Sequence, residues 1–334
     1  NLLLDAACGL TTQEAADAFA MSVAKCGDIK ASIVAREKAM TVKRNGVLEI
    51  VDLKPGLNDI GGLEQLKDWL GKRKMAFSEE AQAYGLPIPK GVLLIGVPGA
   101  GKSLTAKATA TIFDVPLLKL DAGKLFGSLV GESESLVRCA IQTAEAVAPS
   151  VLWVEELDKS FSGSKSSGQT DGGTSARVFS TFLQWLQEKT SRVFVVATAN
   201  DVTQLPPELL RKGRWDEMFM VDLPNKTERI EIWKVHMIKR GRNPSQFDLE
   251  KLAERTETFT GAEIEAALNE GMFNAFDQKQ EVKDEHLFAA IVNTVPLSRT
   301  MAADIERLRG WATGRARRAS AGDPTINPLG RRMA

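Results

Sequence analysis

The sequence of 334 residues predicts an α/β protein, a doubly wound parallel sheet of five strands followed by a small all-α domain and preceded by a helical N-terminal segment. Short runs that are apolar rather than alternating, interrupted only by Lys119, alternate with helix-length segments, which is typical of parallel strands buried on both faces. After Pro224 the strand pattern stops and helical periodicity takes over. The five predicted strands are residues 92–95, 117–120, 151–154, 193–197 and 218–221.

The composition excludes several classes of protein. Lys+Arg and Asp+Glu are equal at 43 each, so no excess charge indicates a nucleic-acid or membrane partner. No apolar run approaches the roughly 20 residues that span a bilayer. The three cysteines form no CxxC pair, which argues against a disulfide framework or a zinc site and favours a cytoplasmic location. The chain starts at Asn1 without a charged-then-apolar leader, so we expect a fragment of a longer protein rather than a signal peptide.

Four segments are expected along the chain. Residues 1–55 form an N-terminal helical segment and linker, in which Thr11 and Glu14 have the spacing of a capping box. The Pro55-Gly56 pair marks the start of the large α/β domain, residues 56–224. Residues 225–300 form the helical domain, with a second capping box at 260–263, and residues 301–334 form a helix and a basic tail.

A glycine-rich loop follows the first predicted strand. Residues 96–103, Gly-Val-Pro-Gly-Ala-Gly-Lys-Ser, fit the pattern G-x-x-x-x-G-K-[ST] between a strand and a helix, as in a P-loop NTPase. Glycines allow backbone N–H groups to approach phosphate oxygens, and the next helix directs its positive end toward them. Lys102 is expected to reach the β- and γ-phosphates of ATP, and Ser103 to ligate Mg²⁺. An accidental match in a chain of this length is on the order of one in a hundred, so a Gly-rich turn with an incidental lysine is the weaker explanation.

Two carboxylates end the predicted strand 151–154. Because ligands of open α/β sheets bind at the carboxyl ends of strands, Glu155 is assigned to the Mg²⁺ shell and Glu156 to polarising the attacking water. Without the phosphate loop, two glutamates after a strand are more often a solvated helix start. The pair and the loop together favour a catalytic site.

Further candidates lie after the next strand. Asn200 ends the run 193–199, where its amide is suited to hold the attacking water or touch the γ-phosphate, although Asn at a strand end is often only a turn residue. Arg211 and Arg214 follow, and alone they fit ordinary surface charges. In a ring of subunits they fit arginine fingers that reach the neighbour's γ-phosphate.

Taken together, these motifs resemble the AAA family of ATPases over about residues 59–290. The resemblance implies an ATPase domain with a helical lid, usually in a hexamer, with Asn200 as sensor 1 and Arg211 and Arg214 as fingers acting in trans. For the lone His236, a packed or solvated residue on a lid helix is the alternative. The nucleotide contacts that the resemblance implies are Ile60, Gly61, Pro98, Gly99, Ala100, Gly101, Lys102, Ser103, Leu104, His236, Gly261 and Ala262.

Within that family, the chain is most similar to a poorly characterised group known as an open reading frame of algal plastid genomes and of cyanobacteria, whose members carry a further N-terminal domain. In an alga this implies the plastid stroma. Three positions depart from the family pattern. Glu155 replaces the usual Asp at the strand end, and Leu129 replaces the aromatic residue of the first pore loop. Ala262 stands where many members have a sensor-2 arginine; the membrane-protease and proteasomal ATPases also lack this arginine.

The sequence leaves three functions open. The first is Mg²⁺-dependent ATP hydrolysis in a ring that remodels or translocates a protein partner. The second is an ATP-gated assembly switch or scaffold with slow hydrolysis, suggested by Glu155 and Leu129. The third is a nucleic-acid motor or loader, suggested only by tail arginines that are more often just solvated: Arg315, Arg317, Arg318, Arg331 and Arg332. The Gly/Ser/Thr-rich stretch 162–175 fits a substrate contact or a plain insertion equally well.

Overall fold

A computed structural model describes residues 3, 7, 12–42, 48–51, 53, 61–121, 132–159, 171–211 and 213–321. Of residues 14, 38–42, 132–133 and 171–179 it describes the backbone only. The chain divides into two compact units. Unit 1 comprises Asn1–Pro55, Leu70–Leu94 and Ala106–Met218, and unit 2 comprises Gly56–Trp69, Ile95–Thr105 and Phe219–Ala334.

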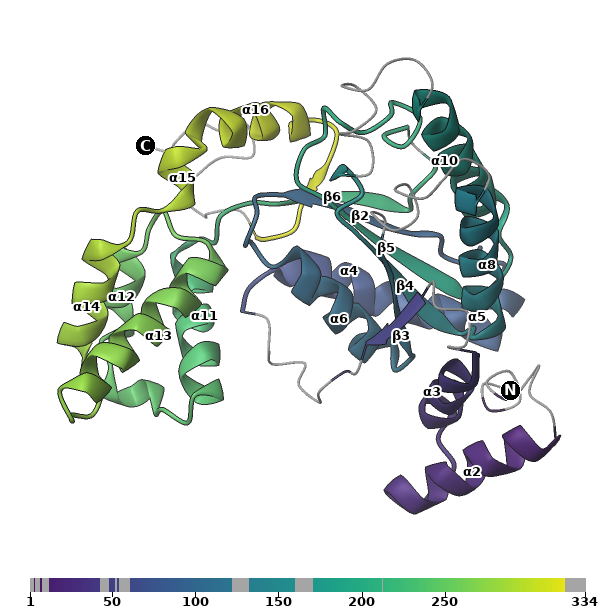
Figure 1. Cartoon of the computed structure of the whole chain (residues 1–334), viewed down its shortest axis with the longest axis horizontal. Coiled ribbons are helices and arrows are strands. Elements are labelled where there is room, and N and C mark those ends of the chain that lie inside the picture. The colour runs from purple at the N-terminus through teal and green to yellow at the C-terminus, as the bar shows by residue number, and fades with distance from the viewer. Residues whose placement is uncertain are drawn as a thin grey trace. The chain divides into compact units, whose positions relative to one another are not determined.

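One sheet carries the strand order β1-β3-β4-β5-β2-β6-β7 (Figure 1). Strands β3, β4 and β5 run parallel to one another, and β1 is antiparallel to β3. The central strands are almost wholly buried because their side chains are apolar on both faces. The bounds are β1 Leu48–Val51, β2 Gly91–Gly96, β3 Leu117–Asp121, β4 Ser150–Glu155, β5 Val193–Ala199, β6 Glu217–Val221 and β7 Arg317–Arg318.

The five predicted strands are confirmed, and the sheet is wider than predicted by one strand at each edge. β1 lies in the segment predicted to be helical, where four residues pair with β3 in the register Leu48↔Leu120 to Val51↔Leu117. β7 lies in the predicted basic tail and pairs in parallel with β6, Phe219↔Arg317. Both are too short to show a period-two pattern, so their strand state depends on the neighbouring strand.

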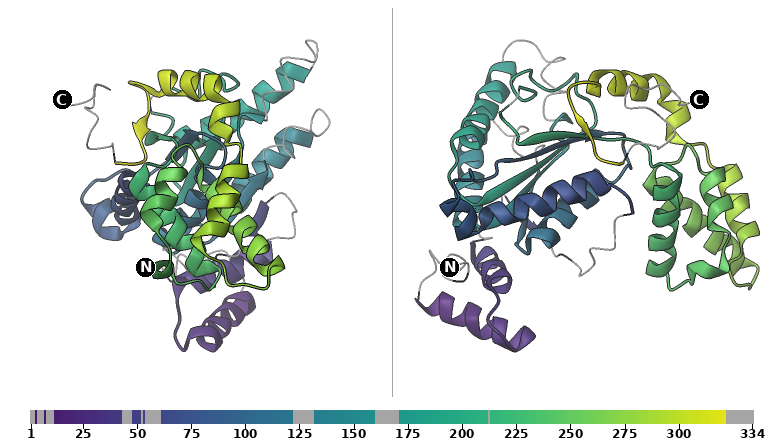
Figure 2. Two further views of the ribbon diagram at one scale, coloured as in Figure 1. Left: turned by 90° about the vertical axis from the view of Figure 1, so that its left-hand side faces the viewer. Right: turned by 180° about the vertical axis from the view of Figure 1, so that it is seen from behind.

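Unit 1 also contains several helices. Helices α2 (Thr12–Cys26) and α3 (Ala31–Val42) pack on each other through Ala18, Val34 and Ala35 (Figure 2). Helices α8 (Glu132–Ala146) and α10 (Asp171–Glu188) lie side by side (Figure 1). The unit also contains η3 (Met75–Phe77), α5 (Glu79–Ala83) and most of α6 (Lys102–Phe113).

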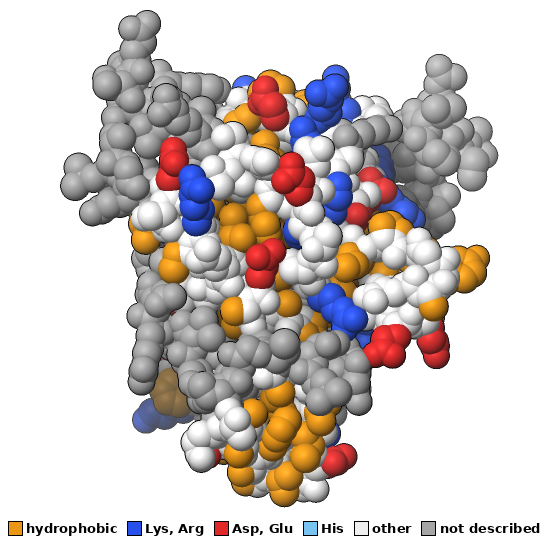
Figure 3. All heavy atoms as spheres, turned by 90° about the vertical axis from the view of Figure 1, so that its right-hand side faces the viewer, with side chains coloured by type: hydrophobic (Ala, Val, Ile, Leu, Met, Phe, Trp, Pro, Cys, Tyr) orange, Lys and Arg blue, Asp and Glu red, His pale blue; other side chains and the backbone are white. Residues whose placement is uncertain are grey.

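Apolar side chains gather on the surface at the lower end of Figure 3, where α2 lies. Met21 and Val23 of α2 are 43% and 47% exposed. Helix α2 therefore presents apolar groups on the side that does not contact α3. None of the described helices has the length and apolarity that crossing a membrane requires.

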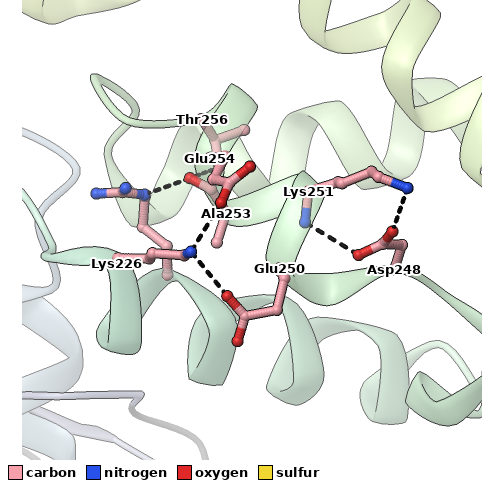
Figure 4. A network of polar contacts seen from close by, with 8 residues as sticks. Lys226, Asp248, Glu250, Lys251, Ala253, Glu254 and Thr256 are labelled. Carbon is pink, nitrogen blue, oxygen red and sulfur yellow. Dashed lines mark hydrogen bonds and ion pairs between the residues drawn. The ribbon is translucent and has the colours of Figure 1, made fainter.

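Unit 2 contains a helical subdomain, the lid, with its own core. Trp233, Met237, Leu252, Ile264 and Leu268 are fully or almost fully buried in it. Its surface carries ion pairs: Lys226 lies between Glu250 and Glu254, at 2.8 and 2.9 Å (Figure 4). The lid helices are α11 (Lys226–Lys239), η5 (Pro244–Gln246), α12 (Leu249–Arg255), α13 (Gly261–Asp277) and α14 (Asp284–Asn293).

The chain after the lid returns to the end of β6. Helix α15 (Leu297–Thr300) leads into α16 (Ala302–Ala312), and Arg309 of α16 forms two 2.8 Å bonds with Asp222. Ala319, directly after β7, is fully buried; its N–H donates to Met220 O at 3.0 Å and its carbonyl accepts from Leu66 N in α4 (Glu64–Lys74) at 3.1 Å. The C-terminal segment is thus fixed to the edge of the sheet.

Candidate active site

The phosphate loop connects β2 to α6. Lys102, the first residue of α6, is 7% exposed, and its Nζ donates to the carbonyls of Gly96 and Val97 at 2.7 and 2.8 Å. Gly99 and Gly101 have φ values of +76° and +100°, a backbone region that disfavours side chains. Ser103 and Leu104 follow in the first turn of α6. The loop therefore has the backbone geometry that its glycines predict.

Helix α13 of the lid contacts the phosphate loop through the main chain. The N–H of Ala262 donates to Gly99 O at 3.2 Å, and a Cβ added to Gly99 would lie 3.1 Å from Thr260 Oγ1. Thr260 caps α13 and forms a capping box with Glu263, whose carboxylate also accepts from Leu297 N at 2.6 Å. The predicted loop residues and the predicted Gly261 and Ala262 therefore lie together, at the N-terminus of one lid helix.

Helix α11 of the lid packs against residues 61–63, which precede α4. A Cβ added to Gly61 would lie only 2.8 Å from Ile232 N, so residue 61 must be glycine for the chain to pass so close. The N–H of Leu63 donates to the buried Glu228 at 2.9 Å. His236, one turn after Ile232, is 12% exposed, and its Nδ1 lies 3.6 Å from Glu265. Ile60, also predicted here, lies outside the described residues.

The acidic strand end lies in unit 1. Glu155 is the last residue of β4, and its Oε2 lies 2.5 Å from Lys119 Nζ of β3. The ammonium group also lies 4.9 Å from the centre of the Trp153 ring. The hydrogen bond to Glu155 is the largest cause that raises the pKa of Lys119. The carboxylate assigned to Mg²⁺ thus has an internal cation as its neighbour.

Glu156 has a backbone conformation that is unusual for a residue other than glycine. Its φ is +49°, which costs about 1–3 kcal/mol and persists only where neighbours hold it. Thr198 of β5 holds this turn: its Oγ1 accepts from Glu156 N at 3.0 Å, and its carbonyl accepts from Leu157 N at 2.9 Å. The Glu156 side chain is 41% exposed and pairs with Lys159 at 2.6 Å.

Asn200 follows β5 in a turn that Asp158 fixes. The buried Asp158 accepts from the N–H of Asp201 at 3.0 Å. Burial raises the pKa of Asp158, and this hydrogen bond partly offsets the rise. Asn200 itself is half-buried, directly after the last residue of β5.

The two predicted finger arginines differ in their surroundings. Arg211 is exposed, whereas Arg214 Nη1 donates to Gln187 Oε1 at the end of α10. Their loop is tied down at several points: Lys90 Nζ donates to Gly213 O at 2.9 Å, and Gly91 N donates to Asp216 Oδ2 at 2.9 Å. Lys212 lies outside the described residues.

Lys189 lies near the base of the same loop. Its Nζ donates to Pro89 O at 2.9 Å. Burial lowers the pKa of Lys189 to about 8, with a further lowering contribution from Lys90, while Asp216 and Glu145 act in the opposite direction. A group with a lowered pKa therefore lies close enough to Asp216, at the end of this loop, for the two charges to interact.

The sequence did not single out several residues that position the site, namely Lys119, Asp158, Gln187, Lys189 and Thr198. Lys119 has a signal, because it interrupts the apolar run of β3. The others lie on elements whose contacts depend on the fold. Predictions for Leu129, for most of the stretch 162–175 and for Arg331 and Arg332 fall outside the described residues.

The residues present fit ATP and Mg²⁺. The positive φ values of Gly99 and Gly101, with Lys102 inside the loop, are the features that phosphate oxygens require. Ser103 in unit 2 and Glu155 in unit 1 each carry an oxygen of the kind that Mg²⁺ prefers, and Mg²⁺ needs only one or two such protein ligands beside phosphate and water. The part of the chain that the structure describes contains no group of three or more His, Cys, Asp or Glu suited to a metal ion.

Comparison with known families gives two matches along the chain. Residues 92–223 match the model of the ATPase family associated with various cellular activities (AAA). Residues 246–289 match the AAA+ lid domain. The first match covers β3 to β6, nearly all of β2 and the phosphate loop, and the second covers α12, α13 and the first part of α14 in the lid.

Individual relatives extend this picture. The AAA domain-containing protein ycf46 of Trieres chinensis is 48% identical over 298 residues, which are 89% of this chain and 60% of the relative. That of Guillardia theta is 45% identical over 323 residues, 95% of this chain and 63% of the relative. The proteasome-activating nucleotidase of Thermococcus kodakarensis is 34% identical over 257 residues, 74% of this chain and 64% of the relative. The chain thus spans about three fifths of the length of the curated relatives it matches.

Proposed function

Since the chain belongs to the AAA family of ATPases, with an AAA domain followed by an AAA+ lid, we propose that it hydrolyses ATP with Mg²⁺ as a ring of identical subunits and uses the cycle to move a protein partner. One observation carries the proposal. The phosphate loop, with Lys102 inside it, is bonded through its main chain to the first turn of a lid helix. A nucleotide bound there touches both the loop and the lid, so its loss or cleavage shifts the lid.

Each candidate residue has a role in this proposal. Lys102 binds the β- and γ-phosphates, and Ser103 with Glu155 holds Mg²⁺, which neutralises charge on the phosphates when bound. Glu156 accepts a proton from water as the water oxygen bonds to the γ-phosphorus and the bond to the ADP oxygen breaks. Asn200 orients that water. Arg211 and Arg214 reach the γ-phosphate in the neighbouring subunit and stabilise the transition state.

Similarity to a proteasome-activating nucleotidase supports a protein partner, and membership of the AAA family supports an oligomer, which we propose is a hexamer. We place this activity in the cytosol, or in the plastid stroma for an algal protein, by analogy with the ycf46 relatives.

Turnover of purified variants tests the proposal. We expect Lys102→Ala to lose nucleotide binding, and Glu156→Gln and Arg211→Ala to keep binding but lose turnover by at least about 100-fold. Mixing Glu156→Gln subunits with Arg211→Ala subunits should restore part of the turnover, because some interfaces then combine an intact Glu156 with an intact Arg211. Turnover that survives all three substitutions, or that is equal in isolated monomers, would refute the proposal.

The Lys119–Glu155 pair favours a second candidate, an ATP-gated assembly switch with slow hydrolysis. The positive charge of Lys119 beside Glu155 weakens the binding of Mg²⁺ to this carboxylate and so slows the chemical step. The mass of the oligomer against nucleotide concentration, compared with turnover, separates the two functions. A switch assembles fully with ATP while it turns over less than about once per minute.

The tail arginines do not add support for a nucleic-acid motor. Arg315 donates to Trp311 O at 3.0 Å, and Arg317 lies 5.8 Å from the Phe219 ring centre. Both have contacts within the chain. A tail-dependent, salt-sensitive shift with DNA or RNA would revive that function.

A further inference from the structure

The Lys119–Glu155 contact follows from strand register. Lys119 of β3 is paired with Trp153 of β4, and Asp121 with Glu155. Side chains two residues apart on a strand share a face, so Lys119 and Glu155 are diagonal neighbours on one face of the sheet. At this range a glutamate, with one methylene more than aspartate, reaches the ammonium at 2.5 Å.

The surroundings keep this pair in place. Both side chains are 27% exposed, which shields their attraction from water more than at an open surface. The ammonium lies over the Trp153 ring, a contact that a cation favours. Glu49 of β1 is the register partner of Lys119 on the other side. Lys119, the one charged residue among the apolar residues 117–120 of β3, therefore stays close to Glu155.

We infer that Lys119 is a built-in counter-cation for Glu155, so that the ammonium and a nucleotide-bound divalent cation compete for one carboxylate. This inference rests on the proposed function, in which Glu155 is a ligand of Mg²⁺. The ammonium occupies one carboxylate oxygen and repels a second cation. The chain thereby binds Mg²⁺ with nucleotide more weakly than it would with a neutral residue at position 119.

Binding of a fluorescent, non-hydrolysable ATP analogue to the EDTA-treated full chain, titrated with Mg²⁺, tests this. We expect Lys119→Met, which keeps an apolar stem over Trp153 and removes the charge, to lower the Mg²⁺ concentration at half-maximal tightening by about five- to tenfold. Lys119→Arg keeps the charge and should stay within about twofold of wild type. Lys251→Met, which removes a lysine paired with Asp248 at 2.8 Å on the lid, is the matched control and should not move the midpoint.

A double-mutant cycle gives a readout that a merely structural role would not produce. Glu155→Asp shortens the side chain and breaks the 2.5 Å contact, so it also frees the carboxylate. The effect of Lys119→Met should therefore shrink to about twofold or less in the Glu155→Asp background. Full additivity would show that Lys119 acts without Glu155 and would overturn the inference.

The outcomes separate the inference from the proposed function. If the wild type binds no analogue with Mg²⁺, the proposed function fails. If it binds, but the Mg²⁺ midpoint of Lys119→Met is unchanged or higher, the inference fails and the function stands. Should Lys119→Met not fold, as judged by its melting curve, Lys119→Gln serves as the neutral variant with the same expected shift.

Discussion

The phosphate-loop region of unit 2 and the acidic region of unit 1 are built in different ways. The loop is shaped by main-chain groups: positive φ angles at glycines, carbonyls that accept from Lys102, and an N–H of the lid on Gly99 O. The acidic region is shaped by side chains: Lys119 on Glu155, Thr198 on the turn at Glu156, and Asp158 on the turn at Asn200. The positive φ angles of the phosphate loop require glycine at fixed positions in the sequence. Many different pairs of residues, in contrast, could form the side-chain contacts of the acidic region.

The largest effect should come from filling the space beside Gly99. In Gly99→Val a branched side chain must adopt φ of +76° and lie 3.1 Å from Thr260 Oγ1, which pushes the lid from the loop. We expect affinity for an ATP analogue to fall about 100-fold, measured by fluorescence or calorimetry.

Gly241→Val is the matched control. Gly241, in the turn after α11, has φ of +68° but nothing within 4 Å of an added Cβ. It should lose a similar amount of stability, about 1–3 kcal/mol, and keep nucleotide affinity within about twofold. Equal loss of affinity in both variants would show that strain alone matters, and that the contact between loop and lid does not.

The same contrast explains what the sequence predicts. The strands at 92–95 and 193–197, the loop at 96–103 and the capping box at 260–263 are confirmed because each follows from local pattern or backbone need. Lys119, Thr198 and Asp158 were missed because their roles depend on which strands are neighbours, information that a single strand does not contain. β1 and β7 were not predicted for the same reason, because segments this short form strands only when a neighbouring strand pairs with them.

A pH dependence of stability should arise from Lys189, which lies outside both of these regions, with its ammonium on Pro89 O. Its pKa is about 8 in the folded chain and about 10.5 when unfolded, so the unfolded chain binds more protons between these values. The contribution of Lys189 to stability should therefore rise as pH increases from 8 to 10.5, by at most about 3 kcal/mol.

Chemical denaturation across pH 7–10.5 measures this contribution as a difference between variants. Lys189→Met removes the titrating group, so the gap between wild type and variant should change over that window. Lys234→Met, a lysine 40% exposed beside Glu231, should keep the wild-type slope. If wild type and Lys189→Met have parallel pH profiles, the charge of Lys189 is not coupled to folding.

Thr198→Val should separate catalysis from binding. The substitution keeps the shape but removes the Oγ1 that accepts from Glu156 N, so the strained turn is held by one bond fewer. We expect turnover to fall about tenfold while affinity for the ATP analogue stays within about twofold. Thr143→Val, at a buried threonine of α8, should leave turnover unchanged. A loss of affinity equal to the loss of turnover would mean that Thr198 supports the whole fold rather than the Glu156 turn.

The smallest effect should come from Lys90, which is one of several groups that hold the loop of residues 211–216. Lys90→Met removes the bond to Gly213 O but leaves the Gly91–Asp216 bond in place, so the loop loosens without unfolding. We expect turnover at saturating protein and nucleotide to fall about two- to threefold, and nucleotide affinity to be unchanged. If Lys90 acts through Arg211, as the proposed function requires, the double variant Lys90→Met/Arg211→Ala should turn over no more slowly than Arg211→Ala alone. A multiplicative loss in the double variant would show that Lys90 affects turnover independently of Arg211.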